Sequence, residues 1–154
     1  MPTLHTGESA PSFSLLDEKG ATVALQDFKG QFGVVLVFYP GDMTPGCTLQ
    51  LCSIRDEWSA FEQAGLKVFG VNPATSKSHQ RFKESYKLPF PLLIDADKSV
   101  AESYDSLFSF FGIRLIRRTV IGIDKTGTIR YIKRGMPRPH DILKAMQKHL
   151  TSRS

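Results

Sequence analysis

The sequence has few cysteines, few histidines and no long apolar run, and each shortage removes a class of protein. Two cysteines among 154 residues are too few for a disulfide-stapled secreted scaffold. The four histidines are scattered and none neighbours a cysteine, so we expect no metal site and no cofactor. No apolar run approaches the ~20 residues of a membrane helix. Residues 1–15 lack the charged and apolar parts of a secretory signal, so we expect a cytoplasmic protein without a membrane partner.

What is present fits one globular domain over residues 1–154. Hydrophobic residues make up 41% and charged residues 23%, which argues against disorder. Positive charge is concentrated late in the chain: residues 1–110 hold 9 Lys and Arg against 13 Asp and Glu, whereas residues 111–154 hold 11 against 2. A basic end can attract nucleic acid. No nucleic-acid-binding motif accompanies it, so we interpret it as a solvated face and expect no nucleic-acid partner.

Short apolar runs and helical patterns alternate along the chain. Residues 13–17 and 21–25 are alternating runs around a glycine-bearing turn, which predicts a hairpin. Residues 33–39 form a continuous β-branched and aromatic run, typical of a strand buried on both faces. The other expected elements are a helix over 47–64, a strand over 66–71, a helix from 76 or 78 to 86, a strand over 90–94, a helix over 99–104, strands over 119–123 and 128–132, and a helix over 139–150.

This order of elements predicts the fold class. Strands that alternate with helices imply parallel crossovers, and the closing hairpin makes the sheet mixed. We therefore predict an α/β protein with a central mixed β-sheet flanked by helices and an N-terminal β-hairpin. The order is that of a thioredoxin-like fold.

Cys47 stands where the strand over 33–39 leads into the predicted helix. The free N–H groups and partial positive charge of a helix N-terminus favour a thiolate over a thiol. Open α/β sheets also bind ligands next to the carboxyl ends of their strands, where this loop lies. A buried structural cysteine is the alternative. The Pro, Gly and Thr residues of the preceding loop, 40–46, favour an accessible and reactive thiol.

Ionisation alone gives a thiol only a small advantage. A free cysteine is already partly ionised at neutral pH, so complete ionisation gains ~30-fold, whereas enzymes supply about 10⁶-fold or more. Donors aimed at the developing charge must supply the rest. Thr44 can place a hydroxyl near the sulfur of Cys47, and the amides of Gly46 and Cys47 can add to it. A guanidinium brought in by the fold would serve best, because it stays charged and presents a planar fork.

The residues around Cys47 carry a resemblance to a known family. The pattern Pro40-x-x-x-Thr44-x-x-Cys47 resembles the active-site motif of peroxiredoxins. The longer run over 38–56 is similar to the bacterioferritin comigratory protein (peroxiredoxin Q) subfamily. Residues 118–124 resemble the family's later strand, whose first arginine reaches the active site, and similar phrases occur at 78–79 and 88–93. The resemblance covers almost the whole chain.

The resemblance implies a thiol-dependent peroxidase that reduces hydrogen peroxide and alkyl hydroperoxides. Cys47 would attack the peroxide and become a sulfenic acid. Thr44 and Arg118 would orient and polarise the peroxide, and Pro40 would shield the sulfur from water. A surface charge is the alternative for Arg118, and Arg117 would replace it if the strand register differed by one residue.

Cys52 has two interpretations. It is either an apolar cysteine on a helix face or the thiol that resolves the sulfenic acid as an intramolecular disulfide. Five residues along a helix place two Cα atoms roughly 8–9 Å apart, and a disulfide needs them within about 7 Å. Resolution would therefore require the helix to unwind, exposing Leu49 and Leu51. Regeneration would need thioredoxin or a similar dithiol donor. We expect a monomer, with a dimer as the alternative.

Some features leave alternatives open. Phe108, Phe110 and Phe111 precede the Arg118 strand and could fill the core, form an apolar wall for alkyl hydroperoxides or make a dimer contact. A thioredoxin-like thiol–disulfide oxidoreductase is the second functional hypothesis, although that class usually has Cys-x-x-Cys at a helix start. A redox sensor or a basic nucleic-acid-binding module is the third.

Overall fold

The N-terminal hairpin is present as predicted. The computed structural model describes residues 4–151, with side chains described over 4–148. Strand β1 (Ser14–Asp17) pairs antiparallel with β2 (Thr22–Ala24). One carboxylate oxygen of Asp17 accepts the amides of Lys19 and Ala21, which fixes the turn between the strands. A short 3-10 helix over 25–28 follows.

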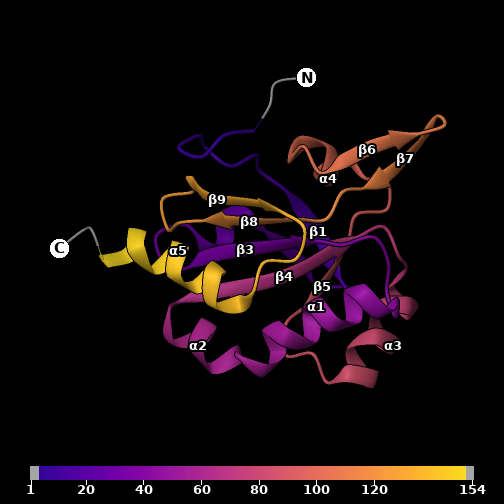
Figure 1. Ribbon diagram of the computed structural model, residues 1–154, viewed down its shortest axis with the longest axis horizontal. Coiled ribbons are helices and arrows are strands. Elements are labelled where there is room, and N and C mark those ends of the chain that lie inside the picture. The colour runs from indigo at the N-terminus through magenta and orange to yellow at the C-terminus, as the bar shows by residue number, and fades with distance from the viewer. Residues whose placement is uncertain (1–3, 152–154) are drawn as a thin grey trace.

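The central sheet is mixed and has seven strands in the order β2-β1-β5-β4-β3-β8-β9 (Figure 1). In the middle of the sheet, β4 pairs in parallel with both β3 and β5. The antiparallel pairs are β3 with β8, β8 with β9, and β1 with β5. Beyond the N-terminal hairpin, the strands of this sheet are β3 (Gly33–Phe38), β4 (Leu66–Asn72), β5 (Leu92–Ile94), β8 (Thr119–Ile123) and β9 (Ile129–Arg134).

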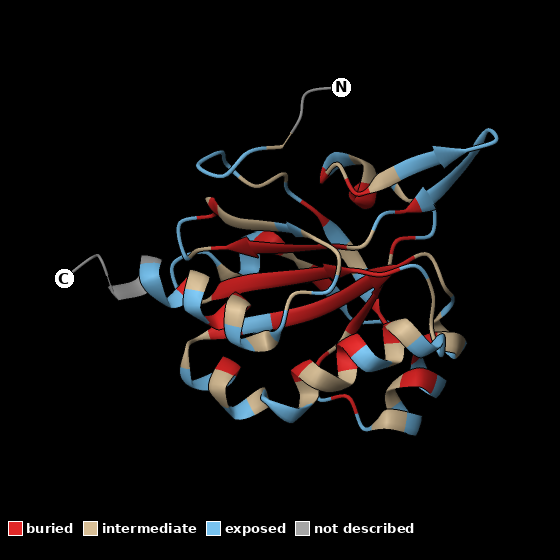
Figure 2. Cartoon of the chain, viewed as in Figure 1, coloured by how far each residue is buried: buried red, intermediate tan, exposed pale blue. Residues whose placement is uncertain are grey.

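Helices cover both faces of this sheet. The helices are α1 (Pro45–Asp56), α2 (Trp58–Gln63), α3 (Ser76–Tyr86), α4 (Ser99–Ser103) and α5 (Pro139–Thr151). Side chains from α1, α2, α3 and α5 form one hydrophobic cluster with alternate residues of β3, such as Val35 and Val37. The intervening residues, such as Leu36, join a second cluster with α4 on the opposite face. The buried residues therefore concentrate in the central strands (Figure 2). Over the described residues, no helix is both long and apolar enough to cross a membrane.

The helix predicted over 47–64 is divided in two. Helix α1 starts earlier, at Pro45, and ends at Asp56, and Glu57 has φ −110° and ψ 22° between the two helices. The amide of Glu57 bonds three residues back to Ile54 rather than four. The break lets Trp58 pack against Phe90 beside β5, with ring centroids 5.7 Å apart. Tertiary packing thus interrupts a continuous helical pattern.

A hairpin missing from the sequence prediction projects from the body of the molecule (Figure 1). It consists of β6 (Leu107–Phe110) and β7 (Ile113–Ile116), joined by Phe111 and Gly112. Both turn residues have positive φ, 50° and 77°, as a tight two-residue hairpin turn requires, and glycine supplies one at no steric cost.

The apolar face of this hairpin points outward. Phe108 lies opposite Leu115, and Phe110 opposite Ile113, so these four side chains share one face, and all four are exposed. Phe111 is 89% exposed at the tip. Core filling is therefore the wrong interpretation of the three phenylalanines. Only the base is anchored in the core, through Ile116, which directs the chain toward Arg118.

Candidate active site

Cys47 lies in the first turn of α1, directly after the loop that follows β3. Thr44 is the N-cap with extended backbone, and Pro45 takes the first helical position, where its missing N–H costs nothing. The amide of Thr48 donates to the carbonyl of Thr44 at 2.8 Å, which closes the first turn. The Cys47 side chain is fully buried and joins the hydrophobic cluster under α1. Its thiol is free.

Arg118 reaches the sulfur of Cys47 from the segment between β7 and β8. Its Nη2 donates to Cys47 Sγ at 3.2 Å, and its Nη1 donates to Gln50 Oε1 at 3.1 Å. The amide contact holds the planar guanidinium in one orientation. Arg117 is exposed, and its backbone amide bonds to Ser106. The fold therefore brings Arg118 to Cys47 and turns Arg117 away.

The absence of a side chain at Gly46 allows this approach. A Cβ built on Gly46 would lie 2.8 Å from Arg118 Nη2, closer than real Cβ contacts allow. A side chain at residue 46 would therefore force the end of Arg118 to shift. Sequence reasoning used Gly46 as a source of an amide and did not detect this steric role.

Thr44 and Pro40 lie in the exposed loop beside the buried sulfur. The Thr44 hydroxyl donates to the carbonyl of Gly41 at 3.2 Å, so its hydrogen is directed into the loop rather than toward Cys47. A hydroxyl oxygen still has lone pairs with which to accept a hydrogen bond from another molecule. The loop is thus the solvent-facing side of the site.

Cys52 lies further along α1 in a different environment. It is half-buried and packs against the hydrophobic cluster. Burial raises the pKa of the Cys52 thiol, with nearby Arg55 lowering it and Asp56 raising it. Leu51 is buried, as expected, but Leu49 is 67% exposed, so the expectation that its burial depends on this helix is wrong. Leu49 therefore points away from the sheet, whereas Leu51 packs toward the sheet.

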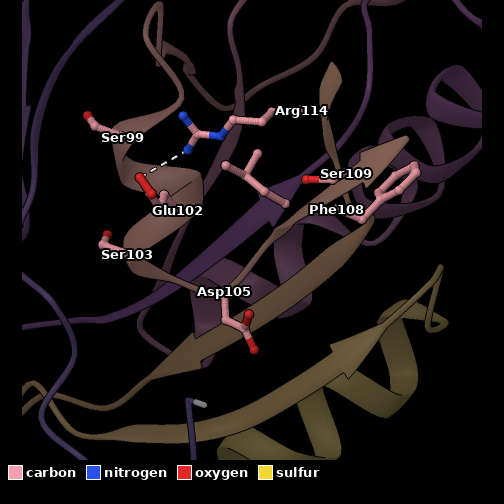
Figure 3. A pocket seen from close by; sticks show the side chains of 8 residues that line it. Ser99, Glu102, Ser103, Asp105, Phe108, Ser109 and Arg114 are labelled. Carbon is pink, nitrogen blue, oxygen red and sulfur yellow. Dashed lines mark ion pairs between the residues drawn. The ribbon is translucent and has the colours of Figure 1, made fainter. Parts of the chain in front are cut away.

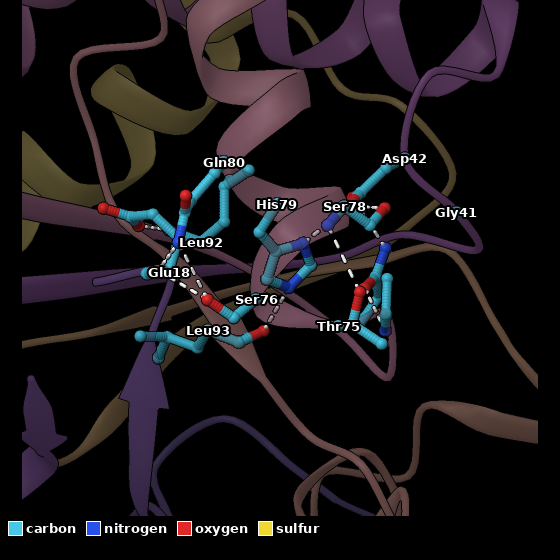
Figure 4. Close-up of polar contacts among 12 residues, drawn as sticks. Glu18, Gly41, Asp42, Thr75, Ser76, Ser78, His79, Gln80, Leu92 and Leu93 are labelled. Carbon is cyan, nitrogen blue, oxygen red and sulfur yellow. Dashed lines mark hydrogen bonds and ion pairs between the residues drawn. The ribbon is translucent and has the colours of Figure 1, made fainter. Parts of the chain in front are cut away.

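A buried polar network holds the loop that leads to Cys47 (Figure 4). Asp42 Oδ1 accepts from the Tyr39 hydroxyl at 2.6 Å and from Asn72 Nδ2 at 3.1 Å. Asp42 Oδ2 accepts from Ser78 Oγ at 2.7 Å and lies 2.6 Å from His79 Nδ1. The loop between β3 and α1, the end of β4 and helix α3 therefore meet at one carboxylate. The sequence offered one signal for this network, the Ser78-His79 pair, without its partner.

The network shifts the titration of its members. Burial alone would raise the pKa of the Asp42 carboxyl, but hydrogen bonds from His79, Tyr39 and Ser78 hold that pKa below its usual value. Burial and the negative charge of Asp42 raise the pKa of Tyr39 well above its usual value. Asp42 is therefore an anion and Tyr39 a neutral donor at neutral pH.

A cavity lies elsewhere, between α4 and the β6–β7 hairpin (Figure 3). It has a volume of about 580 Å³, and Ser99, Glu102, Asp105 and Phe108 are among its lining residues. Arg114 Nη2 forms an ion pair with Glu102 at 2.9 Å across it. Cys47 and Arg118 are not part of its wall. The fully buried Cys47 thiol therefore lies outside this cavity.

Comparison with known proteins identifies the family. The model of the AhpC/TSA family matches residues 6–132. The chain belongs to this family. It is 43% identical over 126 residues to peroxiredoxin Q, chloroplastic, of Oryza sativa subsp. japonica, which covers 82% of this chain and 57% of the rice protein. It is 40% identical over 131 residues to peroxiredoxin Bcp of Bacillus subtilis, which covers 82% of this chain and 83% of that protein. The chain therefore spans little more than half of the rice relative and most of the bacterial one.

Solved peroxiredoxin structures share the fold. Peroxidoxin BcpB from Mycobacterium tuberculosis is 28% identical, with a TM-score of 0.85 over 97% of this chain and 98% of that one. The bacterioferritin comigratory protein of Xanthomonas campestris, which has alkyl peroxide reduction activity, is 25% identical with a TM-score of 0.82, over 89% of this chain and 91% of that one. The predicted thioredoxin-like fold and the peroxiredoxin Q group are confirmed.

Proposed function

We propose that this peroxiredoxin is a thiol peroxidase that reduces hydrogen peroxide and alkyl hydroperoxides at Cys47. The observation that carries the proposal is the guanidinium of Arg118, 3.2 Å from a buried sulfur at the start of a helix. The guanidinium beside the sulfur and the helix N-terminus at which the sulfur lies both interact with the charge that moves when the sulfur attacks a peroxide. Burial strengthens these interactions, because little water screens them.

The first step transfers one oxygen atom from peroxide to sulfur. The Cys47 thiolate attacks one peroxide oxygen, the O–O bond breaks, and a sulfenic acid forms. The other oxygen leaves with the electron pair of that bond and takes a proton, which gives water or an alcohol. Arg118 stabilises the charge that moves from sulfur to the leaving oxygen. The Thr44 oxygen accepts a hydrogen bond from the peroxide, and Pro40 keeps bulk water from the sulfur.

The second step forms a disulfide between Cys47 and Cys52. The Cys52 sulfur attacks the sulfenic acid of Cys47 and displaces its hydroxyl group. The hydroxide takes the proton of the Cys52 thiol and leaves as water. An intact helix holds the two Cα atoms roughly 8–9 Å apart, beyond the reach of about 7 Å. The turn between them therefore unwinds.

Two polar groups reduce the cost of this unwinding. Over the described part of the chain, Thr48 Oγ1 and Gln50 Nε2 are buried without a hydrogen-bond partner. Unwinding exposes both to water, which recovers ~1 kcal/mol or more for each and offsets part of the lost backbone hydrogen bonds. The same segment carries Leu51, whose burial is lost on unwinding.

A dithiol donor of the thioredoxin type then reduces the disulfide. Its two thiols are oxidised to a disulfide as Cys47 and Cys52 return to thiols. Because both cysteines lie on one helix, one chain completes the cycle, which supports a monomer with residues 1–154 as one domain. A reducing compartment such as the cytoplasm supplies donors of this kind.

Mass spectrometry after one equivalent of peroxide tests the function. The wild-type protein should lose the mass of two hydrogens as the disulfide forms, and Cys52→Ser should gain one oxygen. Amide hydrogen exchange across residues 48–54 should increase in the oxidised protein. Reduction of insulin disulfides without consumption of peroxide would instead identify a thiol–disulfide oxidoreductase. A thiol oxidised once, with no turnover when a dithiol donor is supplied, would identify a redox sensor.

A further inference from the structure

Two side chains of helix α3, Ser78 and His79, contact Asp42 in the loop that leads to Cys47. His79 Nδ1 lies 2.6 Å from Asp42 Oδ2, and the side chains of both residues are almost completely buried, at 0% and 2% exposed. Asp42 belongs to the loop between β3 and α1, five residues before Cys47. The contact therefore ties the loop to a helix 37 residues later in the chain.

The hydrogen bonds around the two side chains hold both of them in place. His79 Nε2 lies 2.9 Å from the carbonyl oxygen of Leu93. The hydroxyls of Tyr39 and Ser78 donate to the Asp42 carboxylate. His79 Nδ1 lies beside the same carboxylate, so the buried His79–Asp42 contact is part of this network (Figure 4).

The His79–Asp42 contact borders a strained part of the loop. Met43, between Asp42 and the N-cap Thr44, has a φ of 64°, in the left-handed region that residues other than glycine rarely occupy. Such a conformation persists only where surrounding contacts hold it. Met43 is 43% exposed, so its own side chain supplies little of that restraint. The contacts of the neighbouring Asp42 side chain supply the restraint on the Met43 backbone.

We propose that Asp42 and His79 are positioning residues for the peroxide step. The pair touches neither sulfur nor peroxide. It fixes the path of the loop from Pro40 to Thr44, and thereby the place of the Thr44 oxygen at the mouth of the site. This inference rests on the proposed peroxidase function.

A second side-chain contact of the same helix provides a matched control. Lys83, one turn beyond His79, donates to the carboxylate of Glu18 at 3.1 Å. Glu18 is also buried, at 2% exposed, and accepts the amide of Leu92 at 3.0 Å. Its contacts tie the N-terminal hairpin to α3 and β5. Loss of Glu18 charge therefore perturbs α3 and stability without touching the Cys47 loop.

The experiment separates the two chemical steps in a single turnover. Asp42→Asn, His79→Gln, Glu18→Gln and the wild type are mixed with hydrogen peroxide, quenched by alkylation and analysed by mass spectrometry. In Asp42→Asn and His79→Gln the oxidation of Cys47 should slow about tenfold or more, the scale of a displaced catalytic group. Disulfide formation with Cys52 should stay within about twofold of wild type, since it depends on α1 rather than on the loop. The double variant should be no slower than either single variant.

A milder pair of variants covers the case in which those proteins fail to fold. Ser78→Ala removes one donor to Asp42 and keeps the His79–Asp42 contact, and Ser78→Thr restores a hydroxyl. Oxidation should slow several-fold in the first and recover in the second. Glu18→Gln should lower the melting temperature and leave the oxidation rate unchanged.

Several results would overturn the inference. Oxidation of Cys47 at the wild-type rate in Asp42→Asn or in Ser78→Ala would contradict the positioning role. Equal slowing in Glu18→Gln would also contradict it, because the effect would then come from a general loss of stability. A parallel change in both chemical steps would point to the same general cause. Failure of the wild type itself to reduce peroxide would instead remove the proposed function.

Discussion

The two thiols of α1 occupy opposite environments within one helix. Cys47 is completely buried in the first turn, and the Arg118 guanidinium lies 3.2 Å from its sulfur. Cys52 is half-buried about one and a half turns later. Its neighbours Arg55 and Asp56 carry opposite charges, and burial raises its pKa. The same functional group therefore lies beside a cation at one position and has its pKa raised by burial at the other.

This difference suits the two different tasks proposed for the two cysteines. One sulfur lies at a helix start and beside a cation from a distant segment. The second sulfur has neither, and it lies on a helix face from which it cannot reach the first. We expect Cys47 to react with peroxide first, and Cys52 to react only after the helix opens.

The contrast between the two thiols depends most on Cys47 being the group that attacks peroxide. Cys47→Ser should abolish peroxide reduction, because a serine hydroxyl is not ionised near neutral pH. Cys52→Ser should keep the first turnover and stop the cycle after it. Peroxide consumption, followed by a colorimetric assay, measures both. Rapid consumption by Cys47→Ser would contradict the assignment.

Removal of the cation should have the next largest effect. Arg118→Ala should slow Cys47 oxidation by about 10²-fold or more, the scale for one lost transition-state donor. Arg117→Ala should change it little, because Arg117 points to solvent. Stopped-flow measurement of the first step checks both variants. Similar small losses in the two would remove Arg118 from the site.

Gly46→Ala sharpens the comparison without removing any polar group. The added methyl group would lie 2.8 Å from Arg118 Nη2 and push the guanidinium aside, so oxidation should slow about tenfold. Alanine is the better helix former by about 1 kcal/mol, so the melting temperature should not fall.

The double variant Gly46→Ala with Arg118→Ala is the control for this effect. It should be no slower than Arg118→Ala alone, because the displaced group is already absent. Additive losses would mean that Gly46 acts through something other than Arg118.

The smallest expected effect concerns the charge beside Cys52. Because its pKa is raised, little thiolate is present at pH 7, and disulfide formation should accelerate as the pH rises to 9 and beyond. Asp56→Asn removes a charge that raises this pKa, so the step should speed up about twofold at neutral pH. Quenched-flow measurements from pH 6 to pH 10 test it. Oxidation of Cys47 by peroxide should be unchanged in this variant, and a slower disulfide step would contradict the account.

Periodic patterns predicted most of the sheet and the position of Cys47, but one helix was predicted without its break and one hairpin was not predicted. Helix α1 ends at Asp56, and Trp58 beyond the break packs on Phe90, a residue 32 positions later. The hairpin over 107–116 carries its apolar face outward, and the sequence left core filling, a wall for alkyl hydroperoxides and a dimer contact as open alternatives for its phenylalanines. The Phe111-Gly112 pair was the local signal for its turn.

The sequence by itself determined the local chemistry of this protein. A β-branched run, a loop with proline and glycine, and an apolar helical stripe suffice to place Cys47 at a helix start, because each depends on near neighbours. Only the tertiary structure decided which charged groups surround that loop. Arg118 lies 71 residues from Cys47, and His79 lies 37 residues from Asp42. Those contacts depend on strand order and helix packing, which no short-range pattern encodes.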